Sequence, residues 1–412
     1  MFLTNEKIFE LAKEFGTPLY VYDEKTLRKS CKDMHNLLPK KKLRVSYSAK
    51  ANSNIEIMKI IRSEDIDVDA MSPGEIYTQQ LAGFSADQIF FIPNNVSEEE
   101  MLYAIERNIL VSVDSLSQLE MLGRINPGGN AAVRFNPGCG LGHHEKVTTA
   151  GKKTKFGIQM TQIEEVKMLL KKYNLKLAGI NQHLGSLVLT KEPYLAGVKQ
   201  LLEIAKHFPG LSVIDFGGGF GVPYKEDDPR LDLADLSAAL DEMLTVFLNE
   251  YDNKDVLFRI EPGRYIAAEC GVLLGTVHSV KLNYDTEYAG TDLGFNVLMR
   301  PVLYDSYHAI HIAKKDCSDS QSKPGIYKPY TIVGNICESG DVIAKDRKLP
   351  QIDEGDIIVV QTAGAYGFSM SSNYNCRLRP AEVLINMDGT HRLIRRRETF
   401  EDLLVSSILE EK

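Results

Sequence analysis

Lys50 is the residue of this chain whose type and position most directly suggest chemistry. It follows the apolar run Leu43–Ser48, in a segment that reads LRVSYSAKANSN. A lysine is disfavoured inside a buried strand, because burying an ammonium group without a partner is costly. At the open end of a parallel barrel, the same amine can be desolvated and can form a Schiff base with a carbonyl compound. Taken alone, the segment is explained better by an ordinary lysine at a strand end, whose ammonium group reaches the solvent.

Two later loops carry groups that suit an anion. Gly217, Gly218 and Gly219 are consecutive, and successive unobstructed amide N–H groups form a nest that binds phosphate. Alone, three glycines could equally be a flexible turn, and no P-loop pattern follows them. Arg264 closes the segment Glu261-Pro262-Gly263-Arg264, and its guanidinium could bind the phosphate or a substrate carboxylate. Both roles for Arg264 stay open.

A reactive lysine together with a phosphate nest indicates pyridoxal phosphate as cofactor. This cofactor acts as an electron sink only when a charged partner lies at its pyridine nitrogen, and Glu261 is the candidate for that role. His183 offers a flat ring to stack on the cofactor, and Ser186 offers a hydroxyl group to the phosphate. His183 alone could equally be an ordinary core histidine. The combination of these residues favours the cofactor site.

The last third of the chain carries a second group of candidate residues. Cys337 and Glu338 pair a thiol acid with an acceptor for an ammonium group, although a buried cysteine in a tight turn would give the same pattern. Tyr366 lies between two glycines, which allows its hydroxyl group to approach backbone or phosphate. Arg300 can bind a carboxylate through two parallel hydrogen bonds. These residues would complete a site for an amino-acid substrate.

The elements that must position these residues alternate between strand and helix from about residue 43 to 262. Strand, helix and strand in repetition predict a parallel sheet with right-handed crossovers, and eight strands close a (β/α)8 barrel. The unusual residues fall at the carboxyl ends of the strands, where such barrels carry their chemistry. The predicted strands are 43–48, 66–71, 88–92, 110–114, 131–135, 176–183, 211–216 and 256–260; amphipathic segments between them include 55–63, 74–82, 97–106, 115–122 and 161–173.

The alternation of strand and helix segments ends at about residue 265, which predicts a second domain. Strand-like runs now follow one another with little helix between them, which is typical of a mainly antiparallel β-barrel or sandwich. The early run Pro18–Tyr22 is also strand-like and is expected to pair with this domain. We therefore predict a cofactor-binding barrel over residues 26–268, with residues 1–25 and 269–412 forming the β domain. The predicted β strands are 270–280, 331–333, 356–362, 381–386 and 392–396.

Composition excludes several classes of function. The 412 residues carry a net charge of −8 and no long basic block, which argues against a nucleic-acid partner. No apolar run approaches the roughly 18 residues of a membrane span. The six cysteines are scattered and the first residues do not read as a secretory signal, so a cytoplasmic protein is expected. We expect no metal site. His143 and His144 are the candidate ligands, but adjacent histidines in a loop rarely bind the same ion.

Eleven segments, in preserved order along nearly the whole chain, resemble the diaminopimelate decarboxylase family, whose members have the alanine-racemase-like fold type III of pyridoxal phosphate enzymes. The resemblance implies a homodimer with shared active sites, in which Cys337 and Glu338 come from the partner and Cys337 is the proton donor. It also implies that Arg264, Arg300, Tyr304, Glu338 and Tyr366 contact substrate, with Tyr366 near the phosphate. The matching segments are 48–54, 154–158, 183–186, 217–224, 261–264, 294–296, 300–304, 337–341, 364–367, 371–377 and 393–397.

The activity implied by this resemblance is decarboxylation of meso-2,6-diaminopimelate to L-lysine, the last step of lysine biosynthesis. A decarboxylase of D-lysine, D-ornithine, L-ornithine or arginine would share the cofactor residues, but Arg300 argues against a substrate without a distal carboxylate. A racemase would need a second base opposite Lys50, and Cys337 with Glu338 fits a proton donor better. A non-catalytic relative would be expected to lose Lys50 or the glycines. The loop 138–157 is expected to act either as a lid over the site or as a simple connector.

Overall fold

The computed structural model describes residues 1–136, 138, 154–315 and 327–408. It contains two compact units, which we call the barrel unit and the β unit. The barrel unit comprises residues 28–223 and 227–266, and the β unit comprises residues 1–27, 224–226 and 267–412. The paired histidines at 143 and 144, and most of the loop 138–157, lie outside the described residues.

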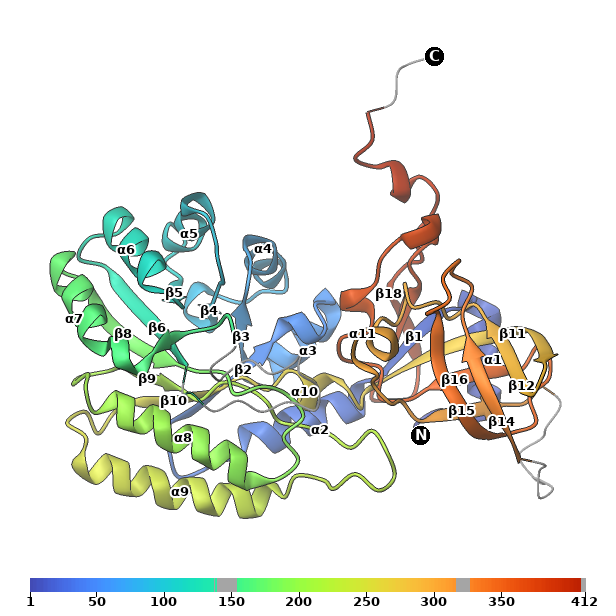
Figure 1. Cartoon of the computed structure of the whole chain (residues 1–412), viewed down its shortest axis with the longest axis horizontal. Coiled ribbons are helices and arrows are strands. Elements are labelled where there is room, and N and C mark those ends of the chain that lie inside the picture. The colour runs from blue at the N-terminus through green and yellow to red at the C-terminus, as the bar shows by residue number, and fades with distance from the viewer. Residues whose placement is uncertain (137, 139–153, 316–326, 409–412) are drawn as a thin grey trace. The chain divides into compact units, whose positions relative to one another are not determined.

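Parallel strands close a ring in the barrel unit, which confirms the predicted (β/α)8 architecture (Figure 1). The hydrogen-bonded order is β5-β4-β3-β2-β10-β9-β8-β6, and pairing of β5 with β6 closes the ring. The short strand β7 (Ile158–Gln159) pairs with β6 beside the ring. The ring strands are β2 (Leu43–Ser48), β3 (Asp67–Ala70), β4 (Ile89–Phe91), β5 (Leu110–Val113), β6 (Asn130–Asn136), β8 (Lys176–Asn181), β9 (Val213–Asp215) and β10 (Leu257–Ile260).

Capping residues fix where the helices of the barrel unit begin, shortly after the strands. Asn54, Ser72, Ser97 and Ser115 each accept a hydrogen bond from a backbone N–H of the first helical turn, which satisfies a donor that would otherwise have no partner. Figure 1 shows the helices ranged around the strands. They are α2 (Glu24–His35), α3 (Ile55–Ser63), α4 (Pro73–Leu81), α5 (Glu98–Ile105), α6 (Leu116–Ile125), α7 (Ile163–Lys172), α8 (Lys191–Ala205), α9 (Leu233–Glu250) and α10 (Arg264–Ala267).

The helices are held to the barrel by apolar faces. On α9, Leu236, Leu240 and Leu244 recur every fourth residue and are fully buried, as expected for the inward face of an amphipathic helix. On α8, Gly197 allows close approach, because a Cβ atom there would lie 2.3 Å from Leu184. This packing makes the strand ends a rigid platform for side chains.

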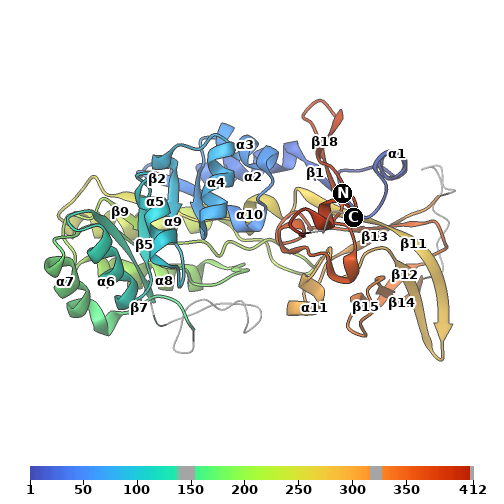
Figure 2. The same cartoon turned by 90° about the horizontal axis from the view of Figure 1, so that it is seen from above.

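A nine-stranded sheet, in which antiparallel pairs predominate, forms the β unit (Figure 2). Strand β1 pairs antiparallel with β11 and parallel with β17, which confirms that the early strand belongs to this sheet. Helices α1 (Asn5–Phe15) and α11 (Arg300–Tyr304) accompany the strands β1 (Leu19–Asp23), β11 (Gly271–Asn283), β12 (Thr286–Thr291), β13 (Ile310–Ala313), β14 (Tyr327–Val333), β15 (Val342–Pro350), β16 (Ile357–Val360), β17 (Ala381–Ile385) and β18 (His391–Arg395).

Three of these strands, β12, β13 and β15, were not among the predicted strands. β15 contains four charged residues, Lys345 to Lys348 with Leu349 after them, and its middle is exposed. Such a strand is held mainly by pairing with its neighbour β14 and has little apolar pattern to reveal it.

Two further features bear on the sequence predictions. Among the helices that the structure describes, none is both long and apolar enough to span a membrane. Among the described cysteines, Cys31 and Cys270 are buried thiols outside any disulfide, whereas Cys337 and Cys376 are exposed thiols. The exposed thiol of Cys337 is therefore available for chemistry.

Candidate active site

Lys50 lies in a tight turn, Ala49–Ala51, at the carboxyl end of β2. Asp69 holds this turn from the neighbouring strand, since its carboxylate accepts hydrogen bonds from Ser48 Oγ at 2.7 Å and from the Ala49 N–H at 3.3 Å. Gly263 packs on the other side, where a Cβ atom would lie 2.9 Å from the Ser48 Cβ atom and 3.2 Å from that of Ala51. The turn that presents Lys50 is thus fixed by residues from three strand ends.

Carboxyl groups surround the charge of Lys50. Burial raises the pKa of Asp69, Glu75 and Glu261, and the positive charge of Lys50 acts against this rise in all three. Asp69 is fully buried and Glu261 is 4% exposed. Lys50 is therefore placed where an ammonium group has nearby acids and where little water competes for them.

The pKa of the Glu75 carboxyl group is shifted by its surroundings. Its Oε2 atom accepts a hydrogen bond from the Met71 N–H at 2.6 Å, while burial raises its pKa from 4.5 to about 7. Between these two pH values the folded chain keeps a proton at Glu75 that the unfolded chain has lost. Ionisation of Glu75 therefore opposes folding, and its cost grows as the pH rises through this window.

We expect the variant Glu75→Gln to gain stability over wild type as the pH rises from about 4.5 to 7. The gain should reach about 1–2 kcal/mol, discounted because the side chain is only half-buried. Urea unfolding of cofactor-free protein at a series of pH values measures it. Glu98→Gln, at an exposed position on α5, is the matched control. Equal pH dependence of the Glu75 variant and wild type would contradict the prediction.

The glycine loop after β9 lies against the ends of β8 and β10. Gly217 has φ +72°, and a Cβ atom there would lie 2.1 Å from the Gln182 carbonyl oxygen. A Cβ atom on Gly218 would lie 2.2 Å from the Glu261 carbonyl oxygen. Asp215 accepts a hydrogen bond from the Gly217 N–H at 2.8 Å. Only glycine fits so close to both neighbouring strand ends.

His183 is fixed as a neutral ring beside this loop. Its Nδ1 atom accepts a hydrogen bond from the Gly218 N–H at 3.2 Å, so no proton is carried there. Burial lowers the pKa of His183 well below its usual value, and the charges of Lys50 and Arg134 act in the same direction. The ring is thus held uncharged next to the lysine.

Arg264 and Ser186 form a pair. Ser186 Oγ accepts hydrogen bonds from Arg264 Nη2 at 2.8 Å and from Nε at 3.2 Å. Arg264 begins α10 and is 6% exposed. The guanidinium and the hydroxyl group therefore act as one polar unit, close in the chain to Pro262 and Gly263.

A buried carboxylate oxygen of the barrel unit belongs to Glu261, directly after β10. Within the described residues, Glu261 Oε1 is buried and has no hydrogen-bond partner. Burial raises the pKa of Glu261 well above its usual value, and the neighbouring carboxylates of Asp215 and Asp69 raise it further. A buried acceptor without a donor is costly, so this atom suits a ligand that brings an N–H group.

In the β unit, Asp341 builds the loop that carries Cys337 and Glu338. Its two carboxylate oxygens accept hydrogen bonds from the N–H groups of Phe295 and Ile336, each at 2.7 Å. The Cys337 N–H donates to Asn375 Oδ1 at 2.8 Å, and Glu338 Oε1 accepts from the Tyr374 hydroxyl at 2.5 Å. Cys337 and Glu338 are both exposed, so this loop presents a thiol and a carboxylate outward.

The other predicted residues of the β unit lie in two places. Arg300 begins α11 and is 2% exposed, whereas Tyr304 ends that helix and is half-buried. Tyr366 has φ +56° and follows Gly364, where a Cβ atom would lie 2.0 Å from the Ala267 carbonyl oxygen. The close packing at Gly364 fixes the backbone that carries Tyr366.

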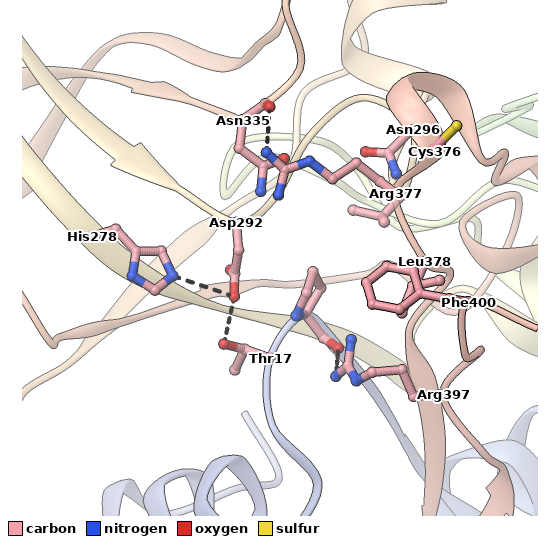
Figure 3. Close-up of a pocket in the computed structure, with 12 residues that line it drawn as sticks. Thr17, His278, Asp292, Asn296, Asn335, Cys376, Arg377, Leu378, Arg397 and Phe400 are labelled. Atoms are coloured by element: carbon pink, nitrogen blue, oxygen red, sulfur yellow. Dashed lines mark hydrogen bonds and ion pairs between the residues drawn. The ribbon is translucent and has the colours of Figure 1, made fainter.

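A cavity of about 580 Å³ also lies in the β unit, but none of the predicted site residues lines it (Figure 3). Polar residues that line it form hydrogen bonds with one another. Asp292 accepts a hydrogen bond from the Thr17 hydroxyl at 2.6 Å, and Arg377 donates to the Asn335 carbonyl oxygen at 3.1 Å. We assign this cavity no part in the candidate active site.

Comparison with known proteins identifies the family. Residues 24–268 match the family model of pyridoxal-dependent decarboxylases, pyridoxal binding domain. The diaminopimelate decarboxylase of Methanothermobacter thermautotrophicus is 40% identical over 403 residues, which cover 96% of this chain and 92% of that protein. The enzyme of that name from Escherichia coli is 35% identical, with 99% and 97% covered. This chain belongs to the diaminopimelate decarboxylase family.

The fold agrees with that of a solved diaminopimelate decarboxylase. The crystal structure of the Helicobacter pylori enzyme complexed with L-lysine superposes with a TM-score of 0.86 at 31% identity, covering 96% of this chain and 98% of that one. Membership of the diaminopimelate decarboxylase family makes this chain a pyridoxal phosphate-dependent decarboxylase. Its barrel unit fits that cofactor, because a lysine amine, a loop of three glycines and the unsatisfied buried Glu261 oxygen lie at its strand ends.

Sequence reasoning passed over some charged residues near Lys50 in this member of the diaminopimelate decarboxylase family. Asp69, Arg134 and Glu75 were not among the residues given a role from the sequence. Ser72 and Glu75 have the spacing of a capping box, and the structure shows Glu75 directed to the Met71 N–H instead of the cap residue. That spacing was the one signal in the sequence for Glu75.

Proposed function

We propose that this chain decarboxylates the D-configured end of meso-2,6-diaminopimelate and releases L-lysine. The observation that carries the proposal is the buried, unsatisfied Glu261 oxygen in a barrel site whose lysine emerges from a fixed turn. Full-length relatives named diaminopimelate decarboxylase support the choice of substrate. The Helicobacter pylori relative has been solved with L-lysine, which is the product expected here.

The barrel unit would hold the cofactor. Lys50 would bind its aldehyde carbon and be displaced by the substrate amine in each turnover. The loop of Gly217, Gly218 and Gly219, with Ser186 and Arg264, would bind the phosphate. The Gly219 N–H would be its main amide donor, because the Gly217 and Gly218 N–H groups donate to Asp215 and His183. His183 would stack on the ring. Glu261 would keep a proton at the ring nitrogen, and Pro262 and Gly263 beside it would contact the cofactor. When bound, pyridoxal phosphate supplies an electron sink for the charge left by carbon dioxide.

The β unit would supply the proton and the substrate contacts. Cys337 Sγ would give a proton to the carbon that has lost the carboxylate, since an exposed thiol can act as a general acid. Arg300, Tyr304 and Glu338 would bind the distal amino-acid end, which carries both a carboxylate and an ammonium group. Tyr366 would contact substrate and phosphate. A site with such charged partners rejects a substrate that lacks the matching charges.

We further propose that the chain acts as a cytoplasmic homodimer with shared active sites. In this arrangement Cys337 and Glu338 serve the barrel of the second copy. Their outward presentation on the loop built by Asp341 supports this assignment. The absence of disulfides among the described cysteines agrees with a reducing compartment.

One preparation tests these statements. Purified protein should be yellow, should have twice the 46.1 kDa mass of one chain, and should release carbon dioxide from meso-diaminopimelate. Release from lysine, ornithine and arginine should be slower by about 10⁴-fold, because each lacks the charged group or spacing that Arg300, Tyr304 and Glu338 require. Equal or better turnover of ornithine would overturn the substrate assignment, and a stable monomer with full activity would overturn the shared site.

A further inference from the structure

We propose that His308 is a positioning residue that holds the Arg300 guanidinium in the orientation that binds the distal carboxylate of the substrate. Nothing in the sequence pattern pointed to His308. The inference rests on the proposed function, in which Arg300 contacts the amino-acid end that remains in L-lysine. All the groups involved belong to the β unit.

Arg300 and His308 form a buried pair. Both side chains are 2% exposed, and Arg300 Nη1 lies 2.8 Å from His308 Nε2. On its other side, His308 Nδ1 lies 2.9 Å from the Gln361 carbonyl oxygen. The imidazole ring therefore bridges the guanidinium and a backbone carbonyl group next to β16.

The partners of His308 determine which of its nitrogens carries the proton. An arginine side chain can only donate hydrogen bonds, and a carbonyl oxygen can only accept them. Nε2 must therefore accept from Arg300, and Nδ1–H must donate to Gln361. This neutral tautomer is the form of the ring that satisfies both contacts.

Tyr224 supplies a third constraint, on the face of the guanidinium. The Arg300 Cζ atom lies 4.6 Å from the centre of the Tyr224 ring. The same ring meets His308 edge-on, with centroids 5.3 Å apart and an interplanar angle of 87°. Arg300 is thus held along one edge by a nitrogen acceptor and on one face by an aromatic ring.

Fixing the guanidinium before substrate arrives affects binding more than chemistry. A planar fork of donors recognises a carboxylate through two parallel hydrogen bonds only when its plane is correctly oriented. An arginine ordered by the fold loses less entropy on binding than a mobile one. Loss of the His308 acceptor should therefore weaken binding of molecules with the distal carboxylate and leave kcat nearly unchanged.

Two substitutions separate this role from ordinary packing. In His308→Gln, the Oε1 atom reaches the place of Nε2 and can still accept from Arg300. In His308→Asn, the shorter side chain can reach the Gln361 carbonyl oxygen but leaves Arg300 without that acceptor. The probes are L-lysine and cadaverine, which differ by the carboxylate alone, and inhibition constants are measured on the cofactor-loaded enzyme.

We expect His308→Asn to weaken inhibition by L-lysine about tenfold and to raise KM for meso-diaminopimelate by a similar factor, which corresponds to the loss of one hydrogen bond to a charged group. Inhibition by cadaverine should not change, and His308→Gln should stay close to wild type. If His308→Asn does not retain cofactor, His308→Ser takes its place, since it also removes the acceptor.

The inference is wrong if His308→Asn weakens both inhibitors equally or neither, or if His308→Gln loses selectivity as fully as His308→Asn. Wild-type turnover of meso-diaminopimelate distinguishes this failure from failure of the proposed function. If wild type acts on that substrate, such results overturn the role of His308 alone. If wild type does not act on it and binds cadaverine as well as L-lysine, the proposed function falls and the inference falls with it.

Discussion

Replacement of Lys50 by alanine is expected to abolish both turnover and the visible absorbance of the cofactor-loaded protein. The turn that presents Lys50 is held by Asp69 and Gly263, so no neighbouring backbone can readily bring another amine to the same place. Loss of the attacking group of a covalent catalyst commonly costs on the order of 10⁴-fold or more in kcat. Carbon dioxide release and the absorbance spectrum after dialysis against pyridoxal phosphate measure the two effects.

Lys59→Ala is the matched control for this variant. Lys59 lies on α3, is half exposed, and pairs with Glu56 on the surface of the barrel unit. It should keep the spectrum and the activity of wild type. If Lys50→Ala retained the visible absorbance while Lys59→Ala lost it, another lysine would bind the cofactor. The assignment of Lys50 would then be wrong.

Replacement of Glu261 by glutamine should lower kcat by about 10²–10³-fold while the protein still binds the cofactor, because one preorganised charge near the reacting system is removed. Glu261 is buried, and burial together with Asp215 and Asp69 raises its pKa. A carboxyl group in this condition can share a proton with a ring nitrogen. An amide of the same shape cannot ionise and so cannot hold that nitrogen in its charged form.

The control for Glu261→Gln is Asp67→Asn, which also neutralises a buried carboxyl group of the barrel. Asp67 is 3% exposed and burial raises its pKa, but the charges that act on it most strongly are those of Arg44 and Arg259. Asp67→Asn should change the free energy of unfolding and have little effect on kcat. Equal losses of kcat in the two variants would mean that Glu261 acts through stability and not at the cofactor.

The barrel could be predicted because its signals are local. Strand β2 and helix α3 begin and end at the predicted residues, since apolar runs, capping residues and helical periodicity all lie within a few positions of one another. Placing Lys50, His183 and Glu261 at strand ends then followed from the geometry of any parallel barrel. That reasoning predicted which residues meet without knowing any contact between side chains.

What could not be predicted depends on contacts between distant parts of the chain. The hydrogen bond from Cys337 to Asn375 joins residues 38 positions apart, and no period or composition signals it. His308 has no neighbour in sequence that marks it as a partner of Arg300. Strand β15 is also found only through its pairing with β14, because its charged residues hide the alternation of a strand.

The central place of β1 in its sheet has a consequence for how the chain is made. β1 is almost wholly buried between β11 and β17, yet β17 begins more than 350 residues later in the sequence. At about 5–20 residues per second, the ribosome leaves this apolar strand without its final neighbour for tens of seconds. The barrel segments emerge during that interval, so the first strand of the nascent chain is an exposed edge that chaperones have reason to cover until synthesis ends.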